Sequence, residues 1–172
     1  PRGCELCSSL PFARGLHFMA TWQVMSIAGA ATSRLHIRLL EPGDFDSGFL
    51  ETLNSLREVG LTAEEAAQIL EDRPPNIRTY VLLVDGQVAA TATLLIEQKF
   101  IHRGGVVGHI EDVATRPDMR GQGLARRLIE HIIDEARAAR CYKVILDCSA
   151  EVEPFYERLG FRQAGKCMRV DL

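Results

Sequence analysis

Apolar positions recur along this chain with two different periods, and the two periods separate predicted strands from predicted helices. Residues 35–39 are apolar at every second position, which indicates a short strand. Asp44 then stands where a helix N-cap is expected, and apolar residues follow at helical spacing over 49–59, just before Gly60. The pattern therefore predicts a first helix over 49–59.

The next block predicts a second helix and an antiparallel meander. A capping-box pattern at 62–65 opens a helix, and the proline pair at 74–75 stops it. Two apolar and β-branched runs, 80–84 and 88–96, flank an Asp-Gly turn and indicate a hairpin. Residues 106–115 predict a third strand of the same meander.

The last block alternates helices with strands. Residues 124–136 follow a glycine-rich loop and carry the strongest amphipathic helical pattern of the chain. Residues 144–146 indicate a buried strand, 154–159 a short helix, and 161–170 a final strand. The order β-α-α-β-β-β-α-β-α-β predicts an α/β fold, with one mixed (α+β) sheet flanked by helices.

Composition indicates an ordinary soluble domain and removes two classes of partner. The chain has 172 residues, with 20 Lys and Arg against 23 Asp and Glu, and a net charge of −3. This charge does not fit a dedicated nucleic-acid binder, and no apolar stretch approaches the ~20 residues of a membrane span. Five cysteines, an odd number at irregular spacing, favour reduced thiols and a cytoplasmic location.

Residues 1–34 follow neither period, and we expect them to be an N-terminal extension, disordered or non-native, ahead of one domain over 35–172. Two alternatives stay open for this segment. Its apolar part, ending in small residues, has features of a secretory signal. Cys4, Cys7 and His17 could begin a zinc site, although structural zinc wants four ligands and no second pair lies near. No metal is expected in the domain itself.

The loop over 120–125, Arg-Gly-Gln-Gly-Leu-Ala, lies between a predicted strand and the N-terminus of the best helix. Backbone N–H groups and the helix dipole favour an anion there, and Gly121 and Gly123 let the backbone approach it closely. Arg120 and Arg126 add positive charge. The loop lacks the Gly-Lys-Ser/Thr of a nucleotide-hydrolysing P-loop, so it indicates another phosphate ligand.

The pattern Arg120-x-x-Gly123-x-Ala125 resembles the pyrophosphate loop of the GNAT acyltransferases. Three further blocks are similar to the glucosamine 6-phosphate N-acetyltransferases of that superfamily: 108–113 (Gly-His-Ile-Glu-Asp-Val), 141–148 (Cys-Tyr-Lys-Val-Ile-Leu-Asp-Cys) and 155–157 (Phe-Tyr-Glu). The resemblance covers the chain from about residue 35 onward. It implies a GNAT fold, acetyl-CoA as co-substrate, D-glucosamine 6-phosphate as acceptor, and a homodimer.

The resemblance also implies catalytic roles. Glu111 and Asp112 would contact the sugar, Asp147 would lie beside its amine, Tyr156 would donate to the departing thiolate, and the Val113 N–H would face the oxyanion. Two points come from the residues themselves: burial at a strand end should raise the pKa of Asp147, and adjacent Glu111 and Asp112 should point to opposite faces unless a bulge intervenes. The expected coenzyme A contacts are Val113, Ala114, Thr115, Arg120, Gly121, Gln122, Gly123, Leu124, Ala125, Arg126 and Tyr156.

For the sugar phosphate, Lys99, His102 and Lys143 could together neutralise a dianion. The sequence departs from the family at Arg57, where a small hydroxyl residue is usual, at Asp171, where a base of the last strand is usual, and at Val152, usually Asn; Arg57 or Arg169 could compensate for the missing base. The expected substrate contacts are Lys99, Phe100, Ile101, His102, Glu111, Asp112, Tyr142, Lys143, Asp147, Arg57 and Arg169.

The predicted reaction is direct acetyl transfer in a ternary complex. Cys148 follows Asp147 on a predicted strand, which should turn its thiol to the opposite face, so an acetyl-cysteine relay is not expected. Three alternatives remain: a protein N-acetyltransferase, an acetyltransferase for another small amine, and a non-catalytic coenzyme A-binding module. The presence of both Asp147 and Tyr156 opposes the last one.

Overall fold

The computed structural model describes residues 34–172, so the expectations for the preceding segment lie outside the described residues. The described strands are β1 (Leu35–Leu39), β2 (Ile77–Val84), β3 (Gln87–Gln98), β4 (Val106–Thr115) and β5 (Cys141–Ile145). The α-helices are α1 (Leu50–Asn54), α2 (Ala63–Glu71), α3 (Ile101–Gly104), α4 (Leu124–Ala138) and α5 (Glu153–Glu157), with shorter turns at Pro42–Asp44, Phe45–Phe49 and Pro117–Met119.

The five strands form one sheet in the order β1-β2-β3-β4-β5. The first four pair antiparallel, and β5 pairs parallel to β4. The predicted mixed sheet is therefore confirmed. The parallel pairing is short: it joins 106–109 of β4 to 141–145 of β5, and β4 continues six residues beyond it to Thr115.

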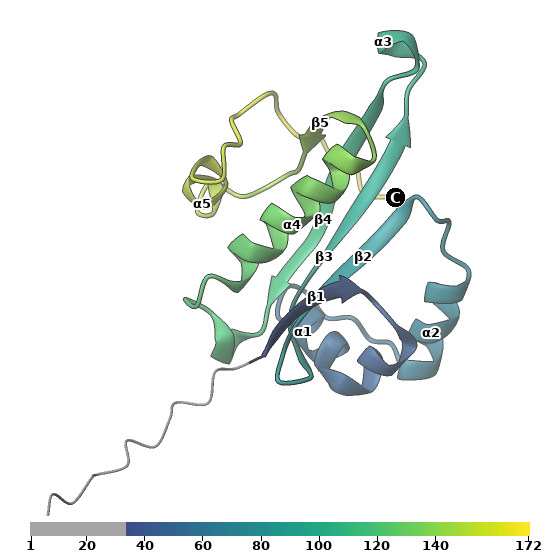
Figure 1. Ribbon diagram of the computed structural model, residues 1–172, viewed down its shortest axis with the longest axis vertical. Helices are drawn as coiled ribbons and strands as arrows, with labels where there is room; N and C mark the ends of the chain where they lie inside the picture. The colour runs from purple at the N-terminus through teal and green to yellow at the C-terminus, as the bar shows by residue number, and fades with distance from the viewer. Residues whose placement is uncertain (1–33) are drawn as a thin grey trace, which may run out of the picture. The chain divides into compact units, whose positions relative to one another are not determined.

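Helices cover both faces of the sheet, and the alternation along β2 decides which residues meet which helix (Figure 1). Tyr80 and Leu82 belong to a core cluster that includes the apolar face of α4, namely Leu124, Leu128, Ile129, Ile132 and Ala136. Val81 and Leu83 point the other way, into a cluster with Phe45, Phe49 and the apolar side of α2. The two-residue period of the strand thus builds two separate cores.

Gly108 allows α4 to lie close against β4. A Cβ at this position would come within 3.1 Å of Leu94, 3.4 Å of Val144 and 3.5 Å of Ala136. The absence of a side chain therefore lets α4 cover the junction between β3, β4 and β5. This packing fixes the parallel pair from which the candidate site opens.

The predicted first helix is wrong in extent, because α1 ends at Asn54. The Asn54 side chain accepts the N–H of Val59 at 2.8 Å, and the Ser55 hydroxyl donates to the carbonyl of Thr115 at 3.2 Å. These bonds compete with the helix for the following turn. Residues 57–62 therefore run as a connection toward α2 rather than as a continued helix.

The predicted final strand over 161–170 is also wrong, since none of the described strands pairs with it. Its sequence contains scattered apolar residues, but a strand exists only where a neighbouring ladder receives its N–H and C=O groups. Met168, Val170 and Leu172 are exposed instead.

Asp44 does not cap the first helix as predicted. Its carboxylate accepts two hydrogen bonds from Arg38, at 2.6 and 2.8 Å, and one from the Glu41 N–H at 2.8 Å. Burial raises the pKa of this carboxyl, but the bonds from Arg38 and Glu41 outweigh that effect and leave the pKa below its ordinary value. Asp44 is 2 % exposed, so the pair ties β1 to the turn before α1.

Arg38→Met should lower the free energy of unfolding by about 3 kcal/mol at pH 7, because it leaves a buried carboxylate unpaired. The stabilisation is present above the pKa of an unfolded aspartate, about 3.9, and disappears as the pH falls through the lower folded value. The difference between the variant and the unmodified chain should therefore shrink below about pH 4. Urea denaturation at both pH values measures it. Arg137→Met, which removes an exposed pair with Asp134, is the matched control and should cost nothing measurable; equal stabilities for all three proteins would contradict the role of Arg38.

Candidate active site

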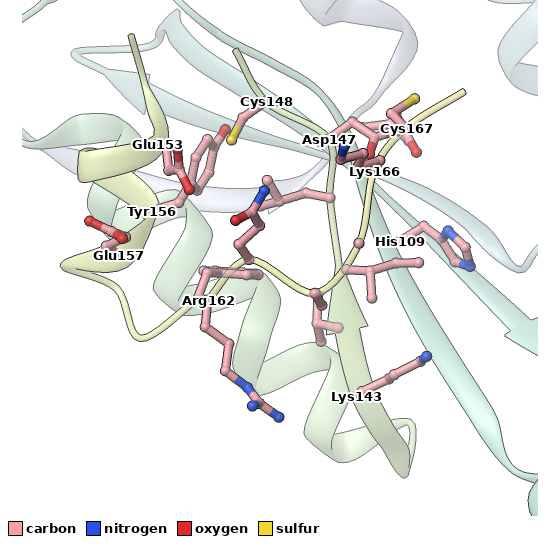
Figure 2. Close-up of a pocket in the computed structure, with 18 residues that line it drawn as sticks. His109, Lys143, Asp147, Cys148, Glu153, Tyr156, Glu157, Arg162, Lys166 and Cys167 are labelled. Carbon is pink, nitrogen blue, oxygen red and sulfur yellow. The ribbon is translucent and has the colours of Figure 1, made fainter. Parts of the chain in front are cut away.

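A pocket of about 440 Å³ opens between β4, the end of β5, α5 and the C-terminal segment 161–167 (Figure 2). Its polar lining brings together four of the predicted site residues, Glu111, Lys143, Asp147 and Tyr156. It also includes His109, Cys148, Glu153, Glu157, Arg162, Gln163, Lys166 and Cys167, which were not predicted as site residues. The pocket is therefore the candidate active site.

The divergence of β4 from β5 makes this space. Their ladder ends at the pair His109 and Ile145, after which β4 continues and the chain leaves the sheet toward α5. Glu111 lies just beyond the ladder on β4, and Asp147 just beyond it after β5. Two groups far apart in the sequence thus reach one cavity because the parallel strands stop pairing.

A β-bulge shapes the same stretch of β4. Thr91 pairs with Ala114 and Thr93 with Glu111, so Ala92 faces the two residues Asp112 and Val113. Asp112 has a left-handed backbone, with φ of +52°. A bulge re-aims side chains and interrupts the ladder, as is common beside active sites.

The bulge separates the two carboxylates that the sequence predicts in the site. Glu111 lines the main pocket, whereas Asp112 lines a second cavity of about 220 Å³ with Arg57 and residues of the chain after α1. Burial, followed by the neighbouring Asp112 and Asp147 carboxylates, raises the pKa of Glu111. The environment of Glu111 therefore favours the protonated form of this carboxyl.

Asp147 departs from its predicted environment. It lies after the end of β5 and is exposed, so the predicted burial is wrong. Cys148 was expected on the opposite face, but it lines the same pocket, because the strand has ended and its alternation no longer applies. Cys167 faces Asp147 from the C-terminal segment, and this carboxylate raises the pKa of the Cys167 thiol.

Tyr156 is the buried member of the pocket. Its ring packs edge-on against Phe155 and Phe161, with centroids 5.0 and 5.8 Å away, and only 8 % of the residue is exposed. Burial and the nearby Cys148 raise the pKa of its phenol. Within the described residues the hydroxyl makes no hydrogen bond, and it borders the pocket. The phenol is thus protonated at neutral pH and free to donate.

Charge is ordered along the two strands. On β4, His109 precedes Glu111, and along β5 and its extension, Lys143 precedes Asp147. Because the strands are parallel and rise about 3.3 Å per residue, both basic groups lie toward one end of the pocket and both carboxylates toward the other. Figure 2 shows His109 and Lys143 on the strand side, away from Tyr156 and Glu153 of α5.

Lys99, Phe100, Ile101 and His102 lie at the tip of the β3-β4 hairpin, outside the pocket lining, and Tyr142 of β5 lies beside them. His102 stacks on Tyr142 with centroids 4.7 Å apart, and the Lys143 ammonium lies 5.6 Å from the same ring. Gly105 permits this, because a Cβ there would be 2.9 Å from Tyr142. Phe100 and Ile101 are exposed at the tip.

Arg57 and Arg169 do not join the main pocket lining. Arg57 borders the second cavity with Asp112, and Arg169 pairs with Asp171 in the exposed C-terminal segment. Neither arginine shares the main pocket with Lys143.

The glycine-rich loop precedes α4 and has the geometry expected of an anion cradle. Gly121 and Gly123 have φ of +77° and +76°, and a Cβ at either would project into open space. Arg120 donates from Nε to the Thr115 carbonyl at 3.2 Å, which ties the loop to the end of β4. Side chains at these glycines would fill the space that the backbone N–H groups face.

The other predicted coenzyme A contacts differ in whether their side chains are accessible to a ligand. Leu124 and Ala114 are buried, so only their backbone groups are available to a ligand. Arg126 pairs with Glu130 at 2.8 Å along α4. Gln122 is exposed, while Val113, Thr115 and Ala125 are half-buried.

His109 is the pocket residue that sequence reasoning most clearly missed. It stands two positions before Glu111, and residues i and i+2 of a strand share a face. That alternation was visible in the sequence and could have found it. The C-terminal lining residues, by contrast, carried no such signal, because their segment forms no regular element.

The part of the chain that the structure describes offers neither a cluster of metal ligands nor a membrane-spanning helix. Residues 34–172 contain no group of three or more side chains able to hold a metal ion. None of the helices formed by these residues has the length and apolar character needed to span a bilayer.

Comparison with known proteins points to one group. Residues 48–161 match the acetyltransferase (GNAT) family. The glucosamine 6-phosphate N-acetyltransferase of Trypanosoma brucei brucei is 43% identical over 142 residues, covering 80% of this chain and 96% of that protein. The Arabidopsis thaliana glucosamine 6-phosphate N-acetyltransferase is 39% identical over 133 residues, covering 72% of this chain and 87% of that protein.

Solved structures agree in fold. The crystal structure of the Arabidopsis thaliana enzyme has a TM-score of 0.76 at 35% identity, covering 80% of this chain and 98% of that chain. A Trypanosoma brucei acetyltransferase has a TM-score of 0.75 at 43% identity, covering 81% of this chain and 100% of that chain. The fold expected from the sequence is confirmed.

Proposed function

Because the chain belongs to the GNAT family of acetyltransferases, and within it to the glucosamine 6-phosphate N-acetyltransferases, we propose that it acetylates the 2-amine of D-glucosamine 6-phosphate. The product is N-acetylglucosamine 6-phosphate, a precursor of UDP-N-acetylglucosamine. The observation that carries the proposal is the order of charge along β4 and β5. A hexosamine 6-phosphate has an anion at one end and an amine near the other, which matches the succession of His109 and Glu111 along β4 and of Lys143 and Asp147 along β5 and its extension.

The residues present fit acetyl-CoA as the co-substrate, which supplies an activated acetyl thioester when bound. The backbone N–H groups of the Gly121–Gly123 loop and of the first turn of α4 hold its pyrophosphate, supported by the charge of Arg120. The backbone of 113–115, beside the bulge, receives the pantetheine arm. No residue in this scheme acts through a metal.

The acidic end orients the acceptor. An amine of this kind titrates near 8, so part of it is neutral at physiological pH and needs only a hydrogen-bond acceptor to aim its lone pair. Glu111 and Asp147 provide such acceptors from the two diverging strands, and the raised pKa of Glu111 suits it to take up the amine proton. Asp112 takes no part in this scheme, because it lines the second cavity with Arg57.

Charge that develops on the acyl oxygen is stabilised by the N–H of Val113, which the bulge releases from regular pairing. Tyr156 keeps its proton at Oη and donates it to the departing thiolate. Positioning of the two reactants within one pocket supplies most of the remaining acceleration.

Direct transfer is favoured over a cysteine relay. Cys148 lines the pocket, but burial and the carboxylates of Glu153 and Asp147 raise the pKa of its thiol. The reactive thiolate is therefore scarce at neutral pH. The acetyl group passes straight from donor to amine.

We also propose that two copies of the chain assemble as a homodimer. Residues 161–172 form no regular element and expose Met168, Val170 and Leu172 without pairing to a described strand. A segment with unpaired backbone groups and apolar side chains can pair with a strand of another copy. The cytoplasmic location stays a prediction.

The first experiment measures thiol release from acetyl-CoA with glucosamine 6-phosphate, with unphosphorylated glucosamine and with an acceptor peptide. Only the phosphorylated sugar should react efficiently, because only it satisfies both ends of the pocket. Acetylation of the peptide would move the chain to the protein acetyltransferases. Binding of coenzyme A without transfer to any acceptor would indicate that the chain is a non-catalytic coenzyme A-binding module.

Tyr156→Phe should lower kcat about 10- to 1000-fold and leave the affinity for coenzyme A nearly unchanged, because it removes one proton donor and keeps the ring. Steady-state kinetics and calorimetry measure the two quantities. Tyr80→Phe is the matched control, since the Tyr80 hydroxyl donates to Glu135 outside the pocket. An unchanged kcat in Tyr156→Phe would reduce this residue to a packing role.

Cys148→Ala should retain most of the activity, because no covalent acetyl-enzyme is formed. Initial rates with both substrates varied should give the intersecting pattern of a ternary complex rather than ping-pong kinetics. Complete loss of activity in a folded variant, together with ping-pong kinetics, would establish the relay instead.

A further inference from the structure

Glu97 and His109, neither of which was predicted from the sequence, form a polar cluster with Lys99 at the edge of the pocket, which His109 lines. Glu97 Oε2 lies 2.5 Å from Lys99 Nζ and 2.9 Å from His109 Nε2. One carboxylate oxygen thus serves two partners. One of them, Lys99, is a predicted phosphate contact, and the other, His109, lines the pocket.

Lys99 and His109, the two partners of Glu97, are both accessible enough to change their interactions. The side chains of Lys99 and His109 are 31% and 22% exposed, so the ammonium can turn to a ligand and the imidazole can exchange a proton with solvent. The hydrogen bond from Lys99 lowers the pKa of Glu97 most, burial opposes it by less, and the bond from His109 lowers the pKa further. Glu97 therefore stays ionised through neutral pH and favours a cation beside it.

The charges around His109 come from every element beside it. Glu97 and Lys99 lie on and just after β3, Glu111 on β4, and Lys143 on β5. Asp147 follows β5, and Arg162 and Lys166 line the same pocket from the C-terminal segment. Glu97 is the one of these in hydrogen-bond contact with the ring.

Binding of a phosphate dianion changes the net charge of this cluster. Lys99 and Lys143 together exceed Glu97 by one positive charge, and a dianion at these two ammonium groups leaves one negative charge in excess. A proton on His109 restores neutrality. It also replaces Lys99 as the charged partner of Glu97 when Lys99 turns to the phosphate.

Building on the proposed function, we propose that Glu97 and His109 couple binding of the acceptor phosphate to uptake of one proton. Lys99 leaves Glu97 for the phosphate, and His109 becomes an imidazolium that keeps Glu97 paired. Both are positioning residues, since they act through Lys99. Because the bound state holds more protons than the free state, affinity falls as the pH rises, by up to tenfold per pH unit.

Calorimetry tests this with the product N-acetylglucosamine 6-phosphate as the probe, whose acetylated nitrogen does not titrate. Binding at pH 7.5 in buffers of different ionisation enthalpy should show uptake of about 0.5 to 1 proton. Unphosphorylated N-acetylglucosamine should take up none. At this pH the phosphate, with a second pKa of about 6, is already mostly dianionic and contributes little.

Two variants separate coupling from a structural role. His109→Gln should abolish the uptake, whereas His36→Gln, at an exposed position of β1, should keep it. Glu97→Gln should abolish the uptake and also bind the product several-fold more tightly at pH 8.5, because Lys99 no longer has to leave a carboxylate. A merely structural Glu97 would instead give weaker binding at every pH.

Product binding without proton uptake, uptake that persists in His109→Gln, or weaker binding by Glu97→Gln would each overturn the coupling. Acetyl transfer to glucosamine 6-phosphate is measured on the same preparations. Transfer that proceeds without proton uptake refutes the coupling alone, whereas absent transfer and absent product binding refute the proposed function.

Discussion

The end of the parallel ladder between β4 and β5 is the constraint on which the rest of the site depends. Backbone pairing holds the strands together as far as His109 and Ile145. Beyond that pair the strands diverge, and side chains from both of them, Glu111 and Asp147, line one pocket. The close approach of α4 over Gly108 fixes this junction from one face of the sheet. Without a defined point of divergence, Glu111 and Asp147 would have no reason to meet.

Two further features extend the same constraint. The bulge at Asp112 and Val113 lies where β4 pairs with β3 but no longer with β5, and there it directs the neighbouring carboxylates Glu111 and Asp112 into separate cavities. The loop with Gly121 and Gly123 is tied back to the end of that strand by the bond from Arg120 to Thr115. The proposed acceptor pocket, oxyanion donor and anion cradle thus follow one another from β4 into the loop after it, which suits a reaction that joins two substrates end to end.

The sequence predicted those parts of the structure whose signal is local. The helix over Leu124–Ala138 has a strict apolar period, and the hairpin of β2 and β3 has an Asp-Gly turn, so both were predicted closely. The first helix was overextended, because the bond from Ser55 to Thr115 joins residues 60 positions apart and is invisible to a local pattern. In the site, resemblance found Glu111, Lys143, Asp147 and Tyr156, and the alternation along β4 could have added His109, whereas Glu97 required the cross-strand hydrogen bond.

The hairpin tip shows how the basic end is held ready before a ligand arrives. His102 and Arg103 both adopt left-handed backbones, with φ of +51° and +58°, and such conformations cost roughly 1 kcal/mol or more for each non-glycine residue. The stacking of His102 on Tyr142 offsets part of this cost, and Gly105 leaves the room for it. The same ring lies beneath Lys143, while Glu97 restrains Lys99 from the strand below. Contacts with the protein itself thus restrict the ammonium groups of Lys99 and Lys143 before a ligand binds, so a phosphate that binds them loses less entropy in ordering them.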